Sequence, residues 1–170
     1  MPDFLFSALN DQLSENFRDL LIRKMRKKIS NTKVDIAIHI RLGDFQKPSV
    51  KSSYTFNDAL PLEWFDAALK YTLQNIHFQE QPTIVVYCSD ACRDVERWCY
   101  KNNLQLSQSR NALQAMLEMS YAQVIIPSMS TFSLWSGFLS SARMVMPLQA
   151  KLDCYLSEQM KQRTTKLVLE

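Results

Sequence analysis

The chain has 170 residues, of which 46% are hydrophobic and 22% charged, and this balance is that of an ordinary globular protein of about one domain. Its 20 basic and 17 acidic residues leave a net charge of +3, too mild by itself to indicate a nucleic-acid-binding protein. No stretch approaches the ~18 apolar residues of a membrane span, and the N-terminus lacks the features of a signal peptide, so we expect a cytoplasmic protein without a transmembrane segment.

The first predicted element is a helix from Leu9 to Ile29, in which apolar residues recur at helical spacing and form a single stripe. Basic residues gather toward the end of this helix, at Arg23, Lys24, Arg26, Lys27 and Lys28. Cations suit the negative end of the helix dipole, so a solvated helix end explains the cluster. A contact with an anionic partner or a membrane surface is the alternative.

Strands and helices alternate after this helix. Runs that are β-branched or almost continuously apolar predict strands at 34–40, 83–88, 124–126 and 144–146. Apolar periodicity and capping residues predict helices that start at Pro61 and Ser89, and two more at 113–121 and 132–139.

This alternation predicts an α/β fold, in which a Rossmann-like parallel sheet carries helices on both faces. We expect a single Rossmann-like domain over residues 1–150, with an N-terminal helix, and a C-terminal tail over 151–170 that the pattern does not assign. The four cysteines, Cys88, Cys92, Cys99 and Cys154, do not form paired Cys-x-x-Cys motifs, so we expect buried, reduced thiols and no zinc site.

Polar segments follow three of the predicted strands, at 39–45, 89–90 and 127–133. Ligands of parallel α/β proteins bind beyond the carboxyl ends of the strands, which is where these segments lie. Arg41 has a planar fork of donors that matches phosphate oxygens, and Asp44 is placed to orient it. His39 either contacts the ligand or is a buried histidine bonded within the core. Gly43 either lets the backbone approach a ligand or simply makes a turn.

The segment 127–133 places several hydroxyls where a strand passes into a helix. Ser128, Ser130, Thr131 and Ser133 all fall within six positions. Hydroxyls and free backbone N–H groups at a helix N-terminus bind anions, although a simple helix cap uses the same residue types. No Gly-x-Gly-x-x-Gly and no Walker motif is present, and no Asp-x-Asp offers a site for a divalent metal. We therefore expect neither a cofactor nor a metal.

Four motifs in order resemble the alpha-1,2-fucosyltransferase family, whose members use GDP-fucose. They are His39-Ile40-Arg41-Leu42-Gly43-Asp44-Phe45, Leu60-Pro61-Leu62-Glu63-Trp64-Phe65, Val86-Tyr87-Cys88-Ser89-Asp90 and the run from Met119-Ser120 to Trp135. Together they cover about residues 10–147, which is most of the chain.

The resemblance implies the donor-binding C-terminal half of the GT-B architecture and an inverting, metal-independent transfer of fucose from GDP-fucose to a glycan hydroxyl. Arg41 would bind the pyrophosphate. Asp44 and Asp58 are the carboxylates of the polar loop near this centre, and we expect Asp44 to act with Arg41 in catalysis. His39 would lie on the nucleotide side, with Gly43 beside it. The remaining donor contacts would come from Ser128, Ser130, Thr131 and Phe132.

The chain departs from the family pattern in three respects. Leu42 replaces the second arginine of the first motif. The carboxylate expected near Gln114 or Ala115 to recognise guanine is absent, and Asn111 and Glu118 are the nearest candidates. An acceptor side would also require a further domain or partner chain. A non-catalytic module that binds nucleotide sugars is therefore the alternative to an enzyme.

Overall fold

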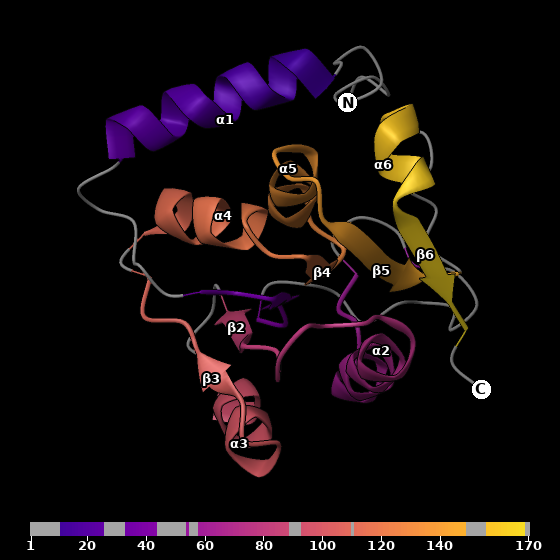
Figure 1. Cartoon of the computed structure of the whole chain (residues 1–170). Coiled ribbons are helices and arrows are strands. Elements are labelled where there is room, and N and C mark those ends of the chain that lie inside the picture. Colours follow the sequence, from indigo (N-terminus) through magenta and orange to yellow (C-terminus); the bar gives the residue numbers. More distant parts are fainter. Residues whose placement is uncertain are drawn as a thin grey trace.

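The core of the computed structural model is a six-stranded, all-parallel sheet with the strand order β3-β2-β1-β4-β5-β6 (Figure 1). The strands are β1 (Ile36–Ile40), β2 (Ile84–Cys88), β3 (Gln105–Leu106), β4 (Val124–Ile126), β5 (Arg143–Pro147) and β6 (Thr164–Leu167). The structure describes residues 11–25, 33–43, 54, 58–88, 93–109, 111–148 and 156–168. The predicted Rossmann-like α/β fold is confirmed.

Helices cover both faces of the sheet. They are α1 (Asp11–Met25), α2 (Leu62–Asn75), α3 (Arg93–Lys101), α4 (Ala112–Ser120), α5 (Thr131–Phe138) and α6 (Glu158–Gln162). In Figure 1, α4 and α5 lie on one face with α1 above them, whereas α2 and α3 lie on the other face. None of the described helices is both long and apolar enough to cross a bilayer.

The alternation of side chains along the central strand divides the core in two. Ile36, Ile38 and Ile40 pack with the aromatic residues of α2 and α3, whereas Ala37 packs with α4. Successive residues of a strand point to opposite faces, so His39 points to the α4 and α5 side with Ala37. β1 is buried at every position, as its apolar sequence predicts.

The predicted elements are found close to their expected bounds. Pro61 differs slightly, because it is the N-cap residue of α2 and stands one position before the first helical residue. Pro147 belongs to β5 as its last residue. The predicted capping residues of α3, Ser89 and Asp90, lie outside the described residues.

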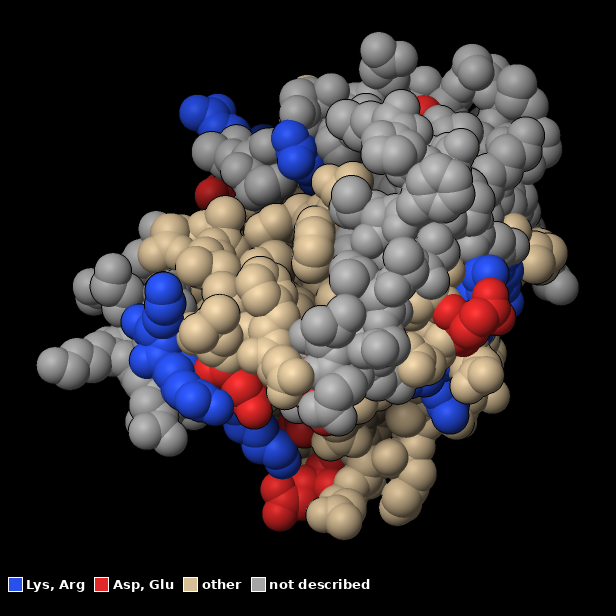
Figure 2. All heavy atoms as spheres, turned by 90° about the horizontal axis from the view of Figure 1, so that it is seen from above, with Lys and Arg blue, Asp and Glu red and all other residues tan. Residues whose placement is uncertain are grey.

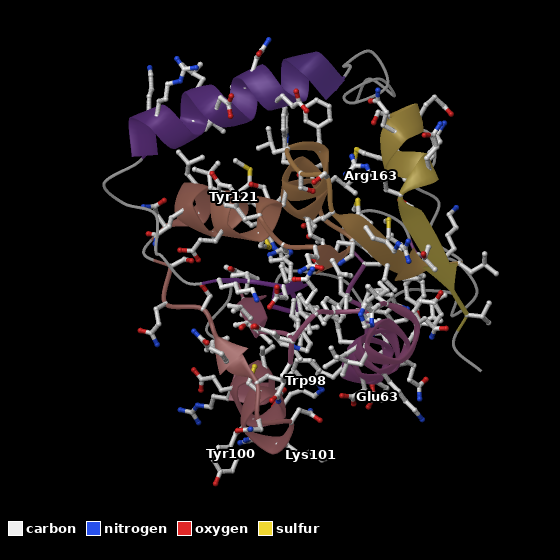
Figure 3. All side chains as sticks on the ribbon, in the orientation of Figure 1. Glu63, Trp98, Tyr100, Lys101, Tyr121 and Arg163 are labelled. Carbon is white, nitrogen blue, oxygen red and sulfur yellow. The ribbon has the colours of Figure 1, made fainter. Side chains whose placement is uncertain are left out.

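Two of the strands, β3 and β6, are not predicted by the sequence pattern, and β6 lies in the C-terminal segment. β6 pairs in parallel with β5, and α6 leads into it. Arg163 holds this unit in place, since its Nη1 donates to the carbonyl oxygens of Ser140 at 2.6 Å and Ala142 at 3.1 Å (Figure 3). The corner between α5 and β5 is thereby tied to the edge of the sheet.

Candidate functional site

The strand order changes direction between β1 and β4, and the crevice beyond the carboxyl ends of such a pair is the usual ligand site of an open α/β sheet. The two strands are neighbours, with Ile38 opposite Ile126. The segments 39–43 and 127–133 therefore meet at this point, as the sequence predicts. The N-terminus of α5, at Thr131, faces the same edge.

A cluster of serines surrounds His39 at the switch point. The Nδ1 atom of His39 lies 2.6 Å from the hydroxyl oxygens of both Ser128 and Ser133. The Ser130 hydroxyl lies 3.2 Å from that of Ser128 and 3.1 Å from that of Ser133. All four residues are buried. The hydroxyls therefore point inward and satisfy one another.

Ser130 also caps α5, because its hydroxyl accepts a hydrogen bond from the backbone N–H of Ser133 at 3.2 Å. A serine at the N-cap position typically stabilises a helix in this way. Its hydroxyl is thus engaged with the helix, and the simple cap is the role that these contacts describe. Thr131, the next residue, is exposed.

Burial keeps His39 neutral. Loss of hydration lowers its pKa to about 3, and the nearby charge of Arg41 adds to this effect. The ring of Phe132 packs on the imidazole, with the ring centres 5.1 Å apart. These are the contacts of an internal residue that joins β1 to α5, which is the second of the two interpretations open from the sequence.

Arg41 follows the last residue of β1 and is half-buried. It stands two residues after His39 in the sequence, and its charge adds to the lowering of the His39 pKa. Leu42 packs against the core, whereas Gly43 is exposed. Asp44 lies outside the described residues, so its predicted partnership with Arg41 stays a prediction.

An anion fits this arrangement chemically. The first turn of a helix presents backbone N–H groups and the positive end of its dipole, and a guanidinium adds a full charge. At the switch point such donors would be the first turn of α5, the exposed Thr131 and Arg41. Among the described residues, no group of three or more His, Cys, Asp or Glu side chains is arranged to hold a metal ion.

A second buried polar network lies beside the first one, and the sequence pattern did not predict it. The Glu118 carboxylate, on α4, accepts hydrogen bonds from the Ser109 hydroxyl at 2.6 Å and the Gln114 amide at 2.9 Å. It also accepts a longer one, of 3.4 Å, from the Tyr87 hydroxyl. Burial, together with the charge and hydrogen bonding of Glu118, raises the pKa of Tyr87, so that hydroxyl stays protonated.

The spacing of two polar residues in the sequence could have indicated this network. Gln114 and Glu118 stand four residues apart on α4, which places them on one helix face. That face also carries Leu117 into the core, so a carboxylate beside it requires partners.

The thiols agree in part with the expectation. Cys99 is buried and unpaired, and burial raises its pKa to about 11, with smaller effects from Cys88 and Glu96. Cys88, by contrast, is only half-buried. Cys92 and Cys154 lie outside the described residues.

Seen from the α1 side, the described basic side chains form separate groups, several of them beside acidic ones (Figure 2). Arg23 and Lys24 are exposed in the last turn of α1, whereas Arg26, Lys27 and Lys28 lie outside the described residues. The helix-end explanation fits the two described residues of this cluster.

Comparison with known proteins agrees with the fold and the motifs. The profile of Glycosyl transferase family 11 matches residues 4–167, which is nearly the whole chain. No curated protein and no solved structure matches the chain significantly. The match spans both segments of the switch point and both missed strands. The chain therefore belongs to glycosyl transferase family 11, the family of alpha-1,2-fucosyltransferases.

Proposed function

We propose that the chain binds GDP-fucose at the crevice formed by residues 39–45 and 127–133. The observation that supports the proposal is the topological switch point itself, where Arg41 directly follows β1 and His39 contacts Ser133 in the first turn of α5. Family membership supplies the class of substrate, a sugar nucleotide. The diphosphate would lie between the Arg41 guanidinium and the first turn of α5.

The reaction proposed is an inverting transfer that needs no metal. The oxygen of an acceptor hydroxyl attacks C1 of fucose while the bond from C1 to the β-phosphate oxygen breaks, and the electron pair leaves with GDP. Arg41 and the α5 dipole stabilise the negative charge that develops on the leaving diphosphate. A carboxylate of the loop after β1 takes the hydroxyl proton, and Asp44, three residues after Arg41 in the sequence, is the residue proposed for this role.

His39 contributes to this chemistry by staying neutral. An imidazolium at the switch point would repel Arg41, whereas the neutral ring hydrogen-bonds to Ser128 and Ser133 and keeps the α5 N-terminus against β1. Ser130 acts in the same way through its cap. In this proposal the direct donors to phosphate are Arg41, Thr131 and the backbone of α5.

The acceptor is a glycan hydroxyl, held by a further domain or a partner chain in a GT-B arrangement. A non-catalytic module that binds the donor without transferring fucose is the second candidate, favoured by Leu42 in place of the second arginine of the motif. Phosphate binding through Arg41 is common to both candidates.

Calorimetric titration with GDP, GDP-fucose and inorganic pyrophosphate tests the proposal. We expect all three to bind, and a chelator to leave the affinities unchanged. Absence of binding by any of them would refute the proposal for this crevice. Release of GDP from GDP-fucose, with or without a glycan acceptor, then separates an enzyme from a binding module.

A further inference from the structure

The positive charge of the chain is concentrated in one short segment at the end of α1 and after it. Six of the 20 basic residues and none of the 17 acidic ones lie between positions 20 and 34, so the rest of the chain is slightly acidic overall. The six are Arg23, Lys24, Arg26, Lys27, Lys28 and Lys33. The proposed transfer of fucose uses none of them.

Contacts within the fold neutralise one of these cations and not the two on α1. The Nζ atom of Lys33 lies 3.6 Å from a carboxylate oxygen of Asp35 and 3.8 Å from one of Glu80. Arg23 and Lys24 are exposed, and neither belongs to an ion pair within the described part of the chain. A helix C-terminus carries about half a negative charge, which is too little to balance even these two cations.

Apolar side chains are exposed on the same helix and on its neighbour. Leu21 packs against the core, but Phe17 is 41% exposed and Leu20 is 49% exposed. α1 packs on α4, whose C-cap residue, Tyr121, is 50% exposed and lies below α1 in Figure 3. The apolar stripe of α1 is therefore only partly covered by the fold.

An anionic membrane surface is the partner that fits both features. A short segment rich in Lys and Arg is typical of proteins that bind anionic lipid headgroups. Amphipathic helices at such surfaces bury Phe and Leu at the boundary between headgroups and acyl chains. A nucleic acid or an acidic protein would attract the cations but would leave Leu20 in water. α1 is also the outermost layer on its face of the sheet, above α4 and α5 (Figure 1).

We propose that the end of α1, with the basic residues that follow it, binds the surface of an anionic phospholipid bilayer. Arg23 and Lys24 contact the headgroups, and Leu20 enters the boundary with the acyl chains. The basic residues at 26–28 add to the electrostatic attraction. The contact is peripheral and reversible, because a few cations and one or two apolar side chains attach a protein to a bilayer without inserting it.

This surface is separate from the proposed donor crevice. The last turn of α1 is the end from which the chain leads, through Lys33, to the amino end of β1 (Figure 1). Arg41 follows the opposite, carboxyl end of the same strand, about 17 Å further along. The inference therefore stands independently of the proposed function.

Flotation of the full chain with lipid vesicles tests the inference. We expect binding to vesicles of equal parts phosphatidylcholine and phosphatidylglycerol but not to pure phosphatidylcholine, and the binding should weaken as salt screens the charges. Arg23→Gln/Lys24→Gln should weaken it by about 25-fold, at about fivefold for each cation removed. Arg26→Gln/Lys27→Gln should have an equal effect. Leu20→Gln should weaken it about five- to tenfold, through lost burial of its side chain.

Each variant has a matched control on the other face of the sheet. Arg93→Gln/Lys101→Gln also removes one arginine and one lysine, both from exposed positions on α3. Leu73→Gln changes a leucine of α2 that is 46% exposed. Both controls should bind the anionic vesicles as tightly as the parent chain. The melting temperature and the GDP affinity should be the same in all of these variants.

Three outcomes would overturn the inference. They are absence of binding to anionic vesicles, equal binding to neutral and anionic vesicles, and equal losses in the α1 variants and their controls. Heparin binding as tight as vesicle binding, and neither reduced by Leu20→Gln, would also overturn it, because the partner would then be a soluble polyanion. GDP binding without vesicle binding would refute this inference and leave the proposed function intact.

Discussion

The two buried polar networks on the α4 and α5 side of the sheet stand on neighbouring strands, yet they handle charge in opposite ways. The network of His39 and the serines is neutral, because burial suppresses the protonation of the imidazole. The network of Glu118 encloses a carboxylate and surrounds it with donors. In the proposed donor site, a neutral network leaves the positive charge to Arg41 and to the positive end of the α5 dipole.

The two networks differ in how much stability is lost when one of their groups is removed. A neutral network can lose one hydroxyl and leave a modest deficit, whereas a buried carboxylate or its donors cannot be left alone without a large penalty. The networks should therefore respond differently to substitution and to pH.

Removing the carboxylate should produce the largest effect. Glu118→Ala leaves Tyr87, Ser109 and Gln114 without their acceptor, and each unpaired buried donor costs about 1–3 kcal/mol. We expect the free energy of unfolding in urea to fall by about 3 kcal/mol or more.

Glu118→Gln should cost much less, because one amide oxygen can still accept from both Ser109 and Tyr87, which share Oε2. The Gln114 amide can then turn to accept from the new N–H group. Equal losses of stability for the alanine and glutamine variants would contradict the hydrogen-bond directions assigned above.

The second prediction concerns Arg41 at the neutral network. Arg41→Ala should weaken GDP binding by about ten- to a hundredfold, the equivalent of roughly 1.5–3 kcal/mol for a hydrogen bond to a charged group. Arg41→Lys should restore part of this loss, because a point charge does not reproduce the fork. Calorimetry measures both, with the melting temperature as the control for folding. Unchanged GDP binding by Arg41→Ala would refute the assigned phosphate contact.

The third prediction is the response of the neutral network to acid. The pKa of His39 is lowered by folding, so the unfolded chain binds the proton more readily and the stability from His39 is lost as pH falls from about 6.5 toward 3. The loss should approach about 1.4 kcal/mol for each pH unit in that window. Urea unfolding at pH 7 and pH 5 measures it. In His39→Gln the free energy of unfolding should change less between pH 7 and pH 5. An equal change in this variant would show that a group other than His39 causes the pH dependence.

The smallest effects separate two adjacent residues. Ser130→Ala removes the cap of α5 and should lower stability by about 1 kcal/mol, with little loss of GDP affinity. Thr131→Ala removes an exposed hydroxyl, so it should weaken GDP binding a few-fold and leave the stability of the fold unchanged. Thermal unfolding and calorimetry on both variants decide the matter. Loss of affinity in Ser130→Ala alone would show that its hydroxyl turns outward to bind phosphate.

Much of the fold could be predicted from sequence, because periodicity and burial agree in the central elements. The runs that became β1, β2 and β4 are apolar enough for a sheet covered on both faces. β3 escaped detection because two residues carry no measurable alternation. β6, with the sequence TTKL, is only partly buried at the sheet edge, so its pattern is polar.

The sequence predicts where in the fold the candidate site residues lie, but not which hydrogen bonds their side chains form. The position of Arg41 and the hydroxyls after two strands followed from the chain order alone. The inward direction of Ser128 and Ser130 depends on how α5 docks against His39, and no local pattern encodes that docking. The Glu118 network likewise joins residues from β2, α4 and the loop after β3, which only the folded sheet brings together.

The hydrogen bonds of Arg163 have a consequence for the solubility of the molecule. β6 covers one edge of β5, a strand whose sequence RMVMP is largely apolar and buried. An uncovered apolar edge strand is a template for pairing with another chain. Because Arg163 fastens the short C-terminal unit to the carbonyls of Ser140 and Ala142, we expect its loss to expose the edge of β5 more often to pairing with another chain.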